Sequence, residues 1–405
     1  MLLRTRLAAM MFLEYAIWGA WAPILGQDLG AQHLGFTGIQ IGWIYSLLPL
    51  AFMISPSVGG QLVDRYMPTQ TFLGIAHLGG AALMWVMSGQ TQFSPMLATM
   101  LGWSLLFAPT MALTNSICFV HLKNSEREFP VIRTMGTIGW IAAGTILTWW
   151  RLHPSALVLP GRIDSLALAA GASLLLGILC FMLPNTPPNR QAKNPWAFLE
   201  ALELFKKPKL AFFFVLCMVA TSEFQFFYML SAPFLNDIGI TEAMIPLTKN
   251  VSQGCEILVL AVLLPILLPW LGVKWSLFIG LAAWPLRYLI FAFQKPLWLI
   301  IASLGLHGFG FAFYFVVAFM YIDRIAPKDI RGSAQALIMF CTYGLGMFLG
   351  SLFCGWVKDA YTPAGGPANW FMVFLVPTII TTACAIVHLV WFREEKTGGT
   401  RIRRR

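Results

Sequence analysis

The chain has 405 residues, of which 58% are hydrophobic and only 11% are charged, and its formal net charge is +10. Soluble domains carry about 25% charged residues, and a mean hydropathy of +0.72 would leave a soluble fold with large aggregating surfaces, so an ordinary soluble enzyme is excluded. The basic residues lie mainly in short segments between apolar runs, which indicates membrane topology rather than binding to nucleic acid.

Apolar runs close to the roughly 20 residues that span a bilayer recur along the whole chain. They predict an all-α membrane protein with twelve transmembrane helices. The expected spans of the first half are 8–27, 38–62, 69–89, 93–118, 131–151 and 165–184. Those of the second half are 209–232, 244–269, 274–294, 296–322, 332–357 and 370–392.

The longest connection, residues 185–208, is proline-rich and basic, and we expect a cytoplasmic linker there. It divides the chain into two six-helix halves, 1–184 and 209–392, which are followed by a basic cytoplasmic tail at 393–405. With both termini in the cytoplasm, most of the 27 Lys and Arg residues fall on the inner side, as the positive-inside rule requires. Those that fall outside are Arg151, Arg162, Lys249, Lys295 and Lys358.

Ionisable residues inside apolar stretches are the strongest functional signal, and they are Glu14, Glu223, Glu256, Arg287 and His307. A charge in hydrocarbon costs about 2.5–3.5 kcal/mol on insertion scales, so such residues usually face a bundle interior or a water-filled cavity. They mark a substrate or ion path and favour a carrier.

An enzyme is disfavoured because the sequence contains no nucleophile–base pair, no metal cluster and no phosphate loop. The seven cysteines lie in or beside apolar runs without metal-ligand or Cys-x-x-Cys spacing, so they are interpreted as buried thiols. We therefore expect neither a metal nor a cofactor.

Arg133, Thr137 and Trp140 are spaced i, i+4, i+7 and should share one helix face. A cation, a hydroxyl and a large ring would make a binding stripe. The alternative is an arginine that stays at the membrane edge beside a packing tryptophan. Asn115 interrupts another apolar run, and either faces a cavity or bonds a neighbouring helix.

Two pairs of polar residues lie at i, i+3 on later helices: Gln225 with Tyr228, and Gln253 with Glu256. An amide and a carboxylate on one face offer donors and acceptors for hydroxyl groups or a base edge. The alternative is an interhelical hydrogen bond, worth about 0.6 kcal/mol in membranes. For Gln253 and Glu256 the binding interpretation is favoured.

His307, Phe311 and Tyr314 are spaced i, i+4, i+7, which predicts a stacking face beside a histidine that binds, titrates or only hydrogen-bonds. Arg287 is interpreted as a fixed structural counter-charge rather than a ligand. In the first span, Glu14 and Trp18 lie at i, i+4 and should share a face.

Gly60, Asp64 and Arg65 end the second span at the inner side. They resemble the first part of the Gly-xxx-Asp-Arg signature of the major facilitator superfamily, while Tyr66-Met67-Pro68 stands in place of its Gly-Arg-Arg part. This segment is interpreted as a conformational latch, with a solvated turn as the alternative. Two six-helix halves with an inner linker are also typical of that superfamily, whose substrate site lies between the halves.

Segments along nearly the whole chain together resemble the nucleoside:proton symporter family of the major facilitator superfamily. They are Glu14–Trp21, Ala112–Ser116, Phe129–Trp140, Leu183–Pro188, Gln253–Glu256, Arg287–Phe291 and Leu306–Gly308.

The resemblance implies import of purine and pyrimidine nucleosides, coupled to protons, across the cytoplasmic (inner) membrane. It implies ligand contacts at Arg133, Thr137, Gln225, Gln253, Glu256 and Phe311. The chain departs from the family pattern at two positions. Ala312 stands where the family has an acidic residue, and Tyr228 where some members have an asparagine.

The full set of expected substrate contacts is Asn115, Arg133, Thr137, Trp140, Gln225, Tyr228, Gln253, Glu256, His307, Phe311 and Tyr314. Phe311 and Trp140 would stack on the base, and Glu256 and Glu14 are the candidates for proton coupling. The expected partners are a nucleoside, protons and the lipid bilayer, with the protein a monomer. The alternatives are a carrier for another small polar metabolite such as a sugar, an uncoupled nucleoside facilitator, and a transport-dead sensor.

Overall fold

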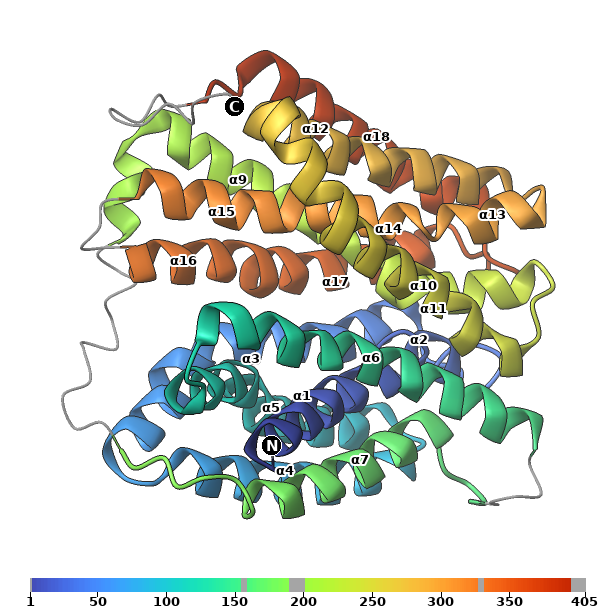
Figure 1. Cartoon of the computed structure of the whole chain (residues 1–405). Helices are drawn as coiled ribbons and strands as arrows, with labels where there is room; N and C mark the ends of the chain where they lie inside the picture. The colour runs from blue at the N-terminus through green and yellow to red at the C-terminus, as the bar shows by residue number, and fades with distance from the viewer. Residues whose placement is uncertain (1, 154–158, 189–200, 327–330, 395–405) are drawn as a thin grey trace.

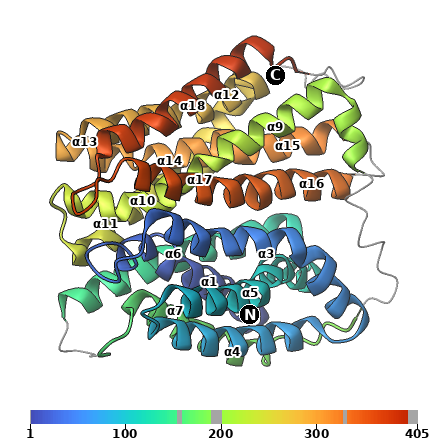
Figure 2. The same cartoon turned by 180° about the vertical axis from the view of Figure 1, so that it is seen from behind.

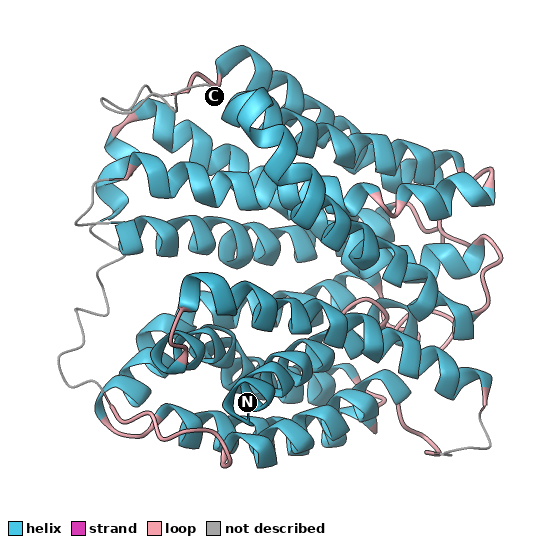
Figure 3. Ribbon diagram, in the orientation of Figure 1, coloured by secondary structure: helices cyan, strands magenta, loops and turns pink. Residues whose placement is uncertain are grey.

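The computed structural model describes residues 2–153, 159–188, 201–326 and 331–394, without the side chains of residues 56–61, 64, 126 and 201. Throughout these ranges the regular structure is helical (Figure 3). Figures 1 and 2 show two bundles, one formed by the helices from α1 to α7 and the other by those from α9 to α18.

The first bundle contains α1 (Leu2–Trp21), α2 (Leu25–Asp28), α3 (Gly38–Arg65), α4 (Thr69–Ser88), α5 (Phe93–His121), α6 (Ser125–Leu152) and α7 (Asp164–Cys180). The second contains α9 (Pro208–Ser222), α10 (Phe224–Asp237), α11 (Ile245–Leu258), α12 (Leu264–Phe293), α13 (Leu297–Ser303), α14 (Leu306–Phe309), α15 (Val317–Ile325), α16 (Arg331–Met339), α17 (Met347–Ala360) and α18 (Trp370–Trp391). Short 3-10 helices lie at η1 (Ala201–Lys206) and η2 (Glu242–Met244).

Ten helical stretches in the described part of the chain are long and apolar enough to cross a membrane, and Asp164–Cys180 is a shorter apolar helix. One of the ten, Glu242–Phe293, has 52 residues, which at about 1.5 Å per residue is more than twice the thickness of the hydrocarbon core. Its helical conformation is interrupted at Gly272, whose φ of 69° favours glycine, so it forms two crossings. The described residues therefore make the twelve crossings that the hydropathy pattern predicts.

Helices of the second half are less regular than those of the first. Helix α9 meets α10 at Glu223, a turn whose φ of −70° and ψ of −17° stay in the right-handed helical region. Three crossings contain π-helical turns, η3 (Val259–Leu263), η4 (Gly310–Val316) and η5 (Phe340–Gly346). A π-turn has an i→i+5 hydrogen-bond pattern, so it changes which side chains share a face, and such turns are frequent at functional sites.

The two halves approach each other closely where α3 meets α17. A Cβ added to Gly42 would lie 2.5 Å from the carbonyl oxygen of Ser351, and a Cβ on Gly355 would overlap the backbone of Gly38. Each helix thus presents two small residues four positions apart, the spacing that lets helix backbones pack closely in membranes. This contact holds the halves together at one end of the bundle.

The predicted latch falls largely outside what the structure describes. Gly60 and Asp64 lie in the helical backbone of α3, among residues whose side chains are not described. Arg65 is the last residue of α3 and is exposed. The latch stays a prediction.

Candidate functional site

A cavity of about 680 Å³ lies between the two bundles and is lined by residues of both. This is the size range of small-molecule sites, which are mostly apolar with a few well-placed polar groups. Its aromatic wall consists of Tyr15, Trp18, Phe52, Trp140, Phe224, Tyr228, Phe311, Phe315, Phe319, Phe340 and Tyr343. Its polar and charged residues other than tyrosine are Ser55, Asn115, Arg133, Thr137, Gln253 and Glu256.

Helix α6 contributes one polar wall. It is continuous over 28 residues, so Arg133, Thr137 and Trp140 keep the helical spacing and all three border the cavity. The Arg133 guanidinium lies 4.0 Å from the centre of the Tyr15 ring, a cation–π contact that leaves its N–H groups free for a ligand. The shared face predicted for these residues is confirmed.

Helix α11 contributes the opposite polar wall through Gln253 and Glu256, which are 7% and 9% exposed. The Gln253 amide makes no hydrogen bond to another described residue, and Glu256 lies 3.4 Å from the Nε2 atom of His307. Burying unsatisfied amide and carboxyl groups is costly. These groups are therefore available to a bound molecule or to water.

Aromatic rings close the cavity between the polar walls. Trp18 and Trp140 are in edge contact with centroids 5.6 Å apart, and Trp140 contacts Tyr228 of the other half at 6.2 Å. Phe311 lies on the wall near α11. Asn115 is also on the wall, and its amide nitrogen donates to the carbonyl of Met111 while its buried oxygen has no protein partner among the described residues.

The Gln225 side chain bonds other residues of the protein and does not line the main cavity. Its amide nitrogen donates to the Ser351 hydroxyl and to the Met347 carbonyl, which ties α10 to α17. Away from those bonds it borders only a void of about 30 Å³, room for about one water. The structure places Tyr228, but not Gln225, on the main cavity wall.

The predicted common face holds for His307 and Phe311, whose rings stack with centroids 6.4 Å apart, but it is wrong for Tyr314. The π-turn η4 begins directly after α14, so position i+7 no longer aligns with positions i and i+4. Phe311 reaches the cavity, while Tyr314 is buried against Trp284 at 5.2 Å. His307 is fully buried behind the wall.

Glu14 faces the interior of the first bundle. One carboxylate oxygen accepts a hydrogen bond from Thr110 at 2.7 Å, and the other lies 3.0 Å from the Nε2 atom of His77. Both Glu14 and His77 are at most 1% exposed, and neither lines the cavity, whereas Trp18 does. Glu14 and Trp18 keep their i, i+4 spacing in the continuous helix α1, but only Trp18 reaches the cavity.

Two buried cations of the second half have no carboxylate partner within 4 Å in the described structure. Lys249, counted on the outer side at the start of the expected span 244–269, is buried in α11 and donates to Phe227 O and the Ser231 hydroxyl. Arg287 bonds the Tyr288 hydroxyl at 3.3 Å, and its Nε and Nη1 atoms have no partner among the described residues. Lys249 is therefore buried rather than exposed at the outer side, and the expected counter-charge Arg287 has no carboxylate within 4 Å among the described residues.

Polar contacts between the two halves gather at one end of the cavity. The Asn250 amide donates to Ile141 O at 2.9 Å, and the Thr148 hydroxyl accepts from the backbone N–H of Leu247 at 3.0 Å. Asp359, near the end of α17, accepts from the backbone N–H groups of Gly38 and Ile39 at the start of α3. A carboxylate at a helix N-terminus is a charge-assisted cap.

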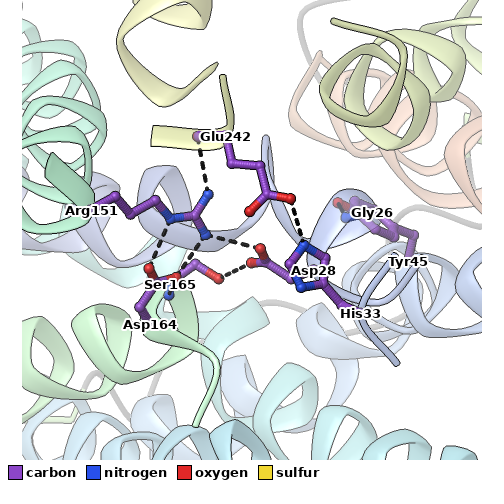
Figure 4. Close-up of polar contacts among 8 residues, drawn as sticks. All are labelled: Gly26, Asp28, His33, Tyr45, Arg151, Asp164, Ser165 and Glu242. Carbon is purple, nitrogen blue, oxygen red and sulfur yellow. Dashed lines mark hydrogen bonds and ion pairs between the residues drawn. The ribbon is translucent and has the colours of Figure 1, made fainter. Parts of the chain in front are cut away.

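Figure 4 shows a second cluster at this end, centred on Arg151. Its guanidinium bonds both oxygens of Asp164 at 2.7 and 2.8 Å and Asp28 at 2.9 Å, and it reaches the Glu242 carbonyl of the other half at 3.4 Å. The Glu242 carboxylate in turn lies 3.0 Å from His33 Nε2. These contacts close this end, while the cavity extends toward the connections after α5 and α15.

The family model for the nucleoside H+ symporters matches residues 1–397 of the chain. The chain belongs to this family. Among curated proteins of Escherichia coli K12, YegT, provisionally named a nucleoside transporter, is 33% identical over 98% of this chain and 96% of its own length. The xanthosine permease is 29% identical over 96% of this chain and 95% of its own. A crystal structure of a mutant of the nucleoside transporter NupG superposes with a TM-score of 0.89 at 27% identity, covering 96% of this chain and 100% of that one.

The cavity wall of this nucleoside H+ symporter also contains residues that the sequence does not single out as ligands, among them Tyr15, Phe224 and Tyr343. Because 14% of the residues in this chain are aromatic, an aromatic side chain alone does not indicate a position on the cavity wall. The inward position of Lys249 could have been predicted from the sequence, because Lys249, Gln253 and Glu256 are spaced i, i+4, i+7 on one face of α11.

Proposed function

We propose that this symporter binds one nucleoside in the cavity between its halves and moves it together with a proton. The observation that carries the proposal is the set of cavity groups without protein hydrogen bonds in the described structure, Arg133 and Thr137 on α6 and Gln253 on α11. They stand on opposite walls of an otherwise aromatic space. A nucleoside has matching parts, a ribose diol and a polar base edge on a flat ring.

The proposed contacts follow from the chemistry of each wall. Gln253 and Glu256 offer donors and acceptors to the diol or the base edge, and Arg133 and Thr137 face them from α6. Trp140 and Phe311 would stack on the base, which is worth about 1–3 kcal/mol per base in single-strand binders. Asn115 and Tyr228 supply further polar contacts from the two halves.

Three of the residues first expected to bind have a different proposed role. Gln225 fixes α10 against α17, Tyr314 packs behind the wall, and His307 lies behind Glu256. They shape the cavity without contacting the nucleoside.

Glu256 is the proposed coupling carboxyl. It borders the cavity, so water in the cavity can exchange a proton with it, whereas Glu14 is enclosed in the first bundle with His77 and Thr110. A proton moving inward down 100 mV contributes about 2.3 kcal/mol, which corresponds to roughly fiftyfold accumulation of substrate.

We place both termini, the linker between the halves and the basic tail in the cytoplasm, because this orientation puts most Lys and Arg residues inside. The closed end with Arg151 then faces outward and the cavity opens to the cytoplasm, an inward-facing state. We further propose the inner membrane as the location and the monomer as the working unit.

Labelled uridine and adenosine uptake into proteoliposomes, with and without an inward proton gradient, tests this function. Accumulation above the outside concentration, competed by unlabelled nucleosides but not by free ribose, is expected. Competition by sugars alone would favour a sugar carrier. Substrate binding without counterflow would favour a transport-dead sensor.

A second candidate, an uncoupled facilitator, is favoured by one observation. The tenth crossing carries Ala312, fully buried and without a titratable group, where the family resemblance leads one to expect an acid. Uptake that stops at equal concentrations under the same gradient would support this alternative.

A further inference from the structure

His307 occupies a site with two unusual properties for a buried histidine. Its ring is held between Phe224 and Phe227, with centroids 5.2 and 4.8 Å away and near-parallel planes. The residue is 0% exposed, and its Nδ1 atom has no hydrogen-bond partner among the described residues. Its Nε2 atom lies 3.4 Å from an oxygen of Glu256. The imidazole is thus aimed at the cavity carboxylate from behind the wall.

The charged groups around this pair come from two helices. Lys249 of α11 lies 4.8 Å and Arg287 of α12 lies 4.2 Å from the centre of the Phe227 ring, the same ring that stacks on His307. Tyr228 of α10 meets the His307 ring edge-on at 6.3 Å. Neither cation has a carboxylate within 4 Å in the described structure. The buried acids of the described second half are Glu256, at i+7 from Lys249 on α11, and Glu223, whose carbonyl accepts from the Tyr288 hydroxyl that Arg287 bonds.

We infer that Glu256 and His307 share the transported proton, with His307 as a positioning residue that holds the proton beside the cavity without touching the nucleoside. This inference rests on the proposed symport and deepens it. It also explains how coupling can work with Ala312 in place of an acid. The second proton-binding group of this chain is then the imidazole of His307, which lies about one helical turn before Ala312 on the same crossing.

The proton balance is simple. Glu256 takes a proton from cavity water when the cavity faces outward. The proton then rests either on the Glu256 carboxyl beside a neutral imidazole or on the His307 imidazole beside a carboxylate, and the pair carries no net charge in either case. When the cavity faces inward, the proton returns to cavity water and leaves the Glu256 carboxylate.

Lys249 and Arg287 make this release favourable. In a site of low dielectric, two cations attract the carboxylate strongly and repel an added proton. The pair therefore gives up its proton once water reaches Glu256. The aromatic faces around His307 offset part of this repulsion, since they interact favourably with a cation while the imidazole is protonated.

The test compares His307→Gln with His77→Gln in proteoliposomes. Both replace a buried histidine that lies beside a buried carboxylate, but only His307 neighbours the cavity carboxylate. Uridine counterflow without a gradient reports binding and alternation, and accumulation under a one-unit pH gradient reports coupling. A 1:1 symporter accumulates substrate about tenfold under that gradient, since each tenfold proton ratio balances a tenfold substrate ratio.

The expected result is that His307→Gln keeps counterflow within about threefold of the wild type, while its accumulation falls to equal concentrations. His77→Gln should accumulate like the wild type. Wild-type accumulation by His307→Gln would overturn the inference, as would loss of accumulation in His77→Gln alone. If counterflow is lost in both His307→Gln and His307→Asn, the histidine is structural and the inference is also overturned. A wild-type protein that neither exchanges nor accumulates nucleosides would instead refute the proposed function.

Discussion

Replacing Gly42 by valine should open the closed end of the cavity. The new Cβ would lie 2.5 Å from the Ser351 carbonyl oxygen, whereas ordinary contact begins at 3.4 Å. The helices α3 and α17 must therefore separate by about 1 Å. The bond from the Ile39 N–H to Asp359, now 2.8 Å, would then exceed the length of a useful hydrogen bond.

The size of the effect follows from the bonds lost. Asp359 accepts from two backbone N–H groups at the start of α3, and a hydrogen bond to a charged group is worth about 1.5–3 kcal/mol. Losing both removes about 3–6 kcal/mol from the closed arrangement. About 5.5 kcal/mol is enough to move a two-state equilibrium from 99:1 to 1:99, so the outward-open state should become a major one.

Electron–electron distance measurements test this directly. Spin labels at Thr91 and Thr241, exposed residues at this end of the two halves, would be placed in a protein whose seven native cysteines are replaced. Gly42→Val should shift the distance distribution to longer values and slow counterflow. Gly171→Val is the matched control, since a Cβ on this helical glycine meets no atom within 4 Å. An unchanged distribution in Gly42→Val would refute the reasoning.

Three further substitutions and one control have expected outcomes. Gln253→Ala should weaken uridine binding about five- to thirtyfold, because the hydrogen bonds between the amide and the ligand are lost. Isothermal titration measures this affinity, and an unchanged affinity would show that Gln253 is not a ligand. Lys249→Met removes a cation near Glu256 and should shift the pH profile of uridine uptake toward higher pH; a shift toward lower pH would contradict the electrostatic argument. Arg151→Gln leaves two carboxylates unpaired and should cost about 3–5 kcal/mol of stability, which thermal unfolding in detergent would measure. Lys206→Gln breaks an exposed pair and should leave the unfolding temperature close to that of the wild type.

The apolar runs predict the crossings well because each must satisfy its backbone inside the bilayer as a helix. Site residues are predictable where the helix is regular. The α6 stripe of Arg133, Thr137 and Trp140 and the α11 pair of Gln253 and Glu256 both reach the cavity. Prediction fails within the π-turn η4, since a periodicity of 3.6 places Tyr314 on a face that the real backbone turns away.

Other errors arise from tertiary contacts that a single sequence does not contain. The amide of Gln225 has the chemistry of a ligand, but Ser351, 126 positions later, takes its hydrogen bond. Glu14 likewise accepts a hydrogen bond from Thr110 and lies 3.0 Å from His77 Nε2, inside the first bundle. Lys249 sits near a helix start, where a lysine usually reaches the membrane edge, yet it turns inward to the Ser231 hydroxyl and the Phe227 carbonyl.

Proton entry during uridine uptake is the most direct test of nucleoside–proton symport through this cavity. Proteoliposomes loaded with a pH-sensitive dye would receive uridine outside at equal pH on both sides. The wild type should acidify the lumen as uridine enters, and Glu256→Gln should not. Uridine entry without acidification by the wild type, or equal acidification by Glu256→Gln, would contradict the role of Glu256 in coupled transport.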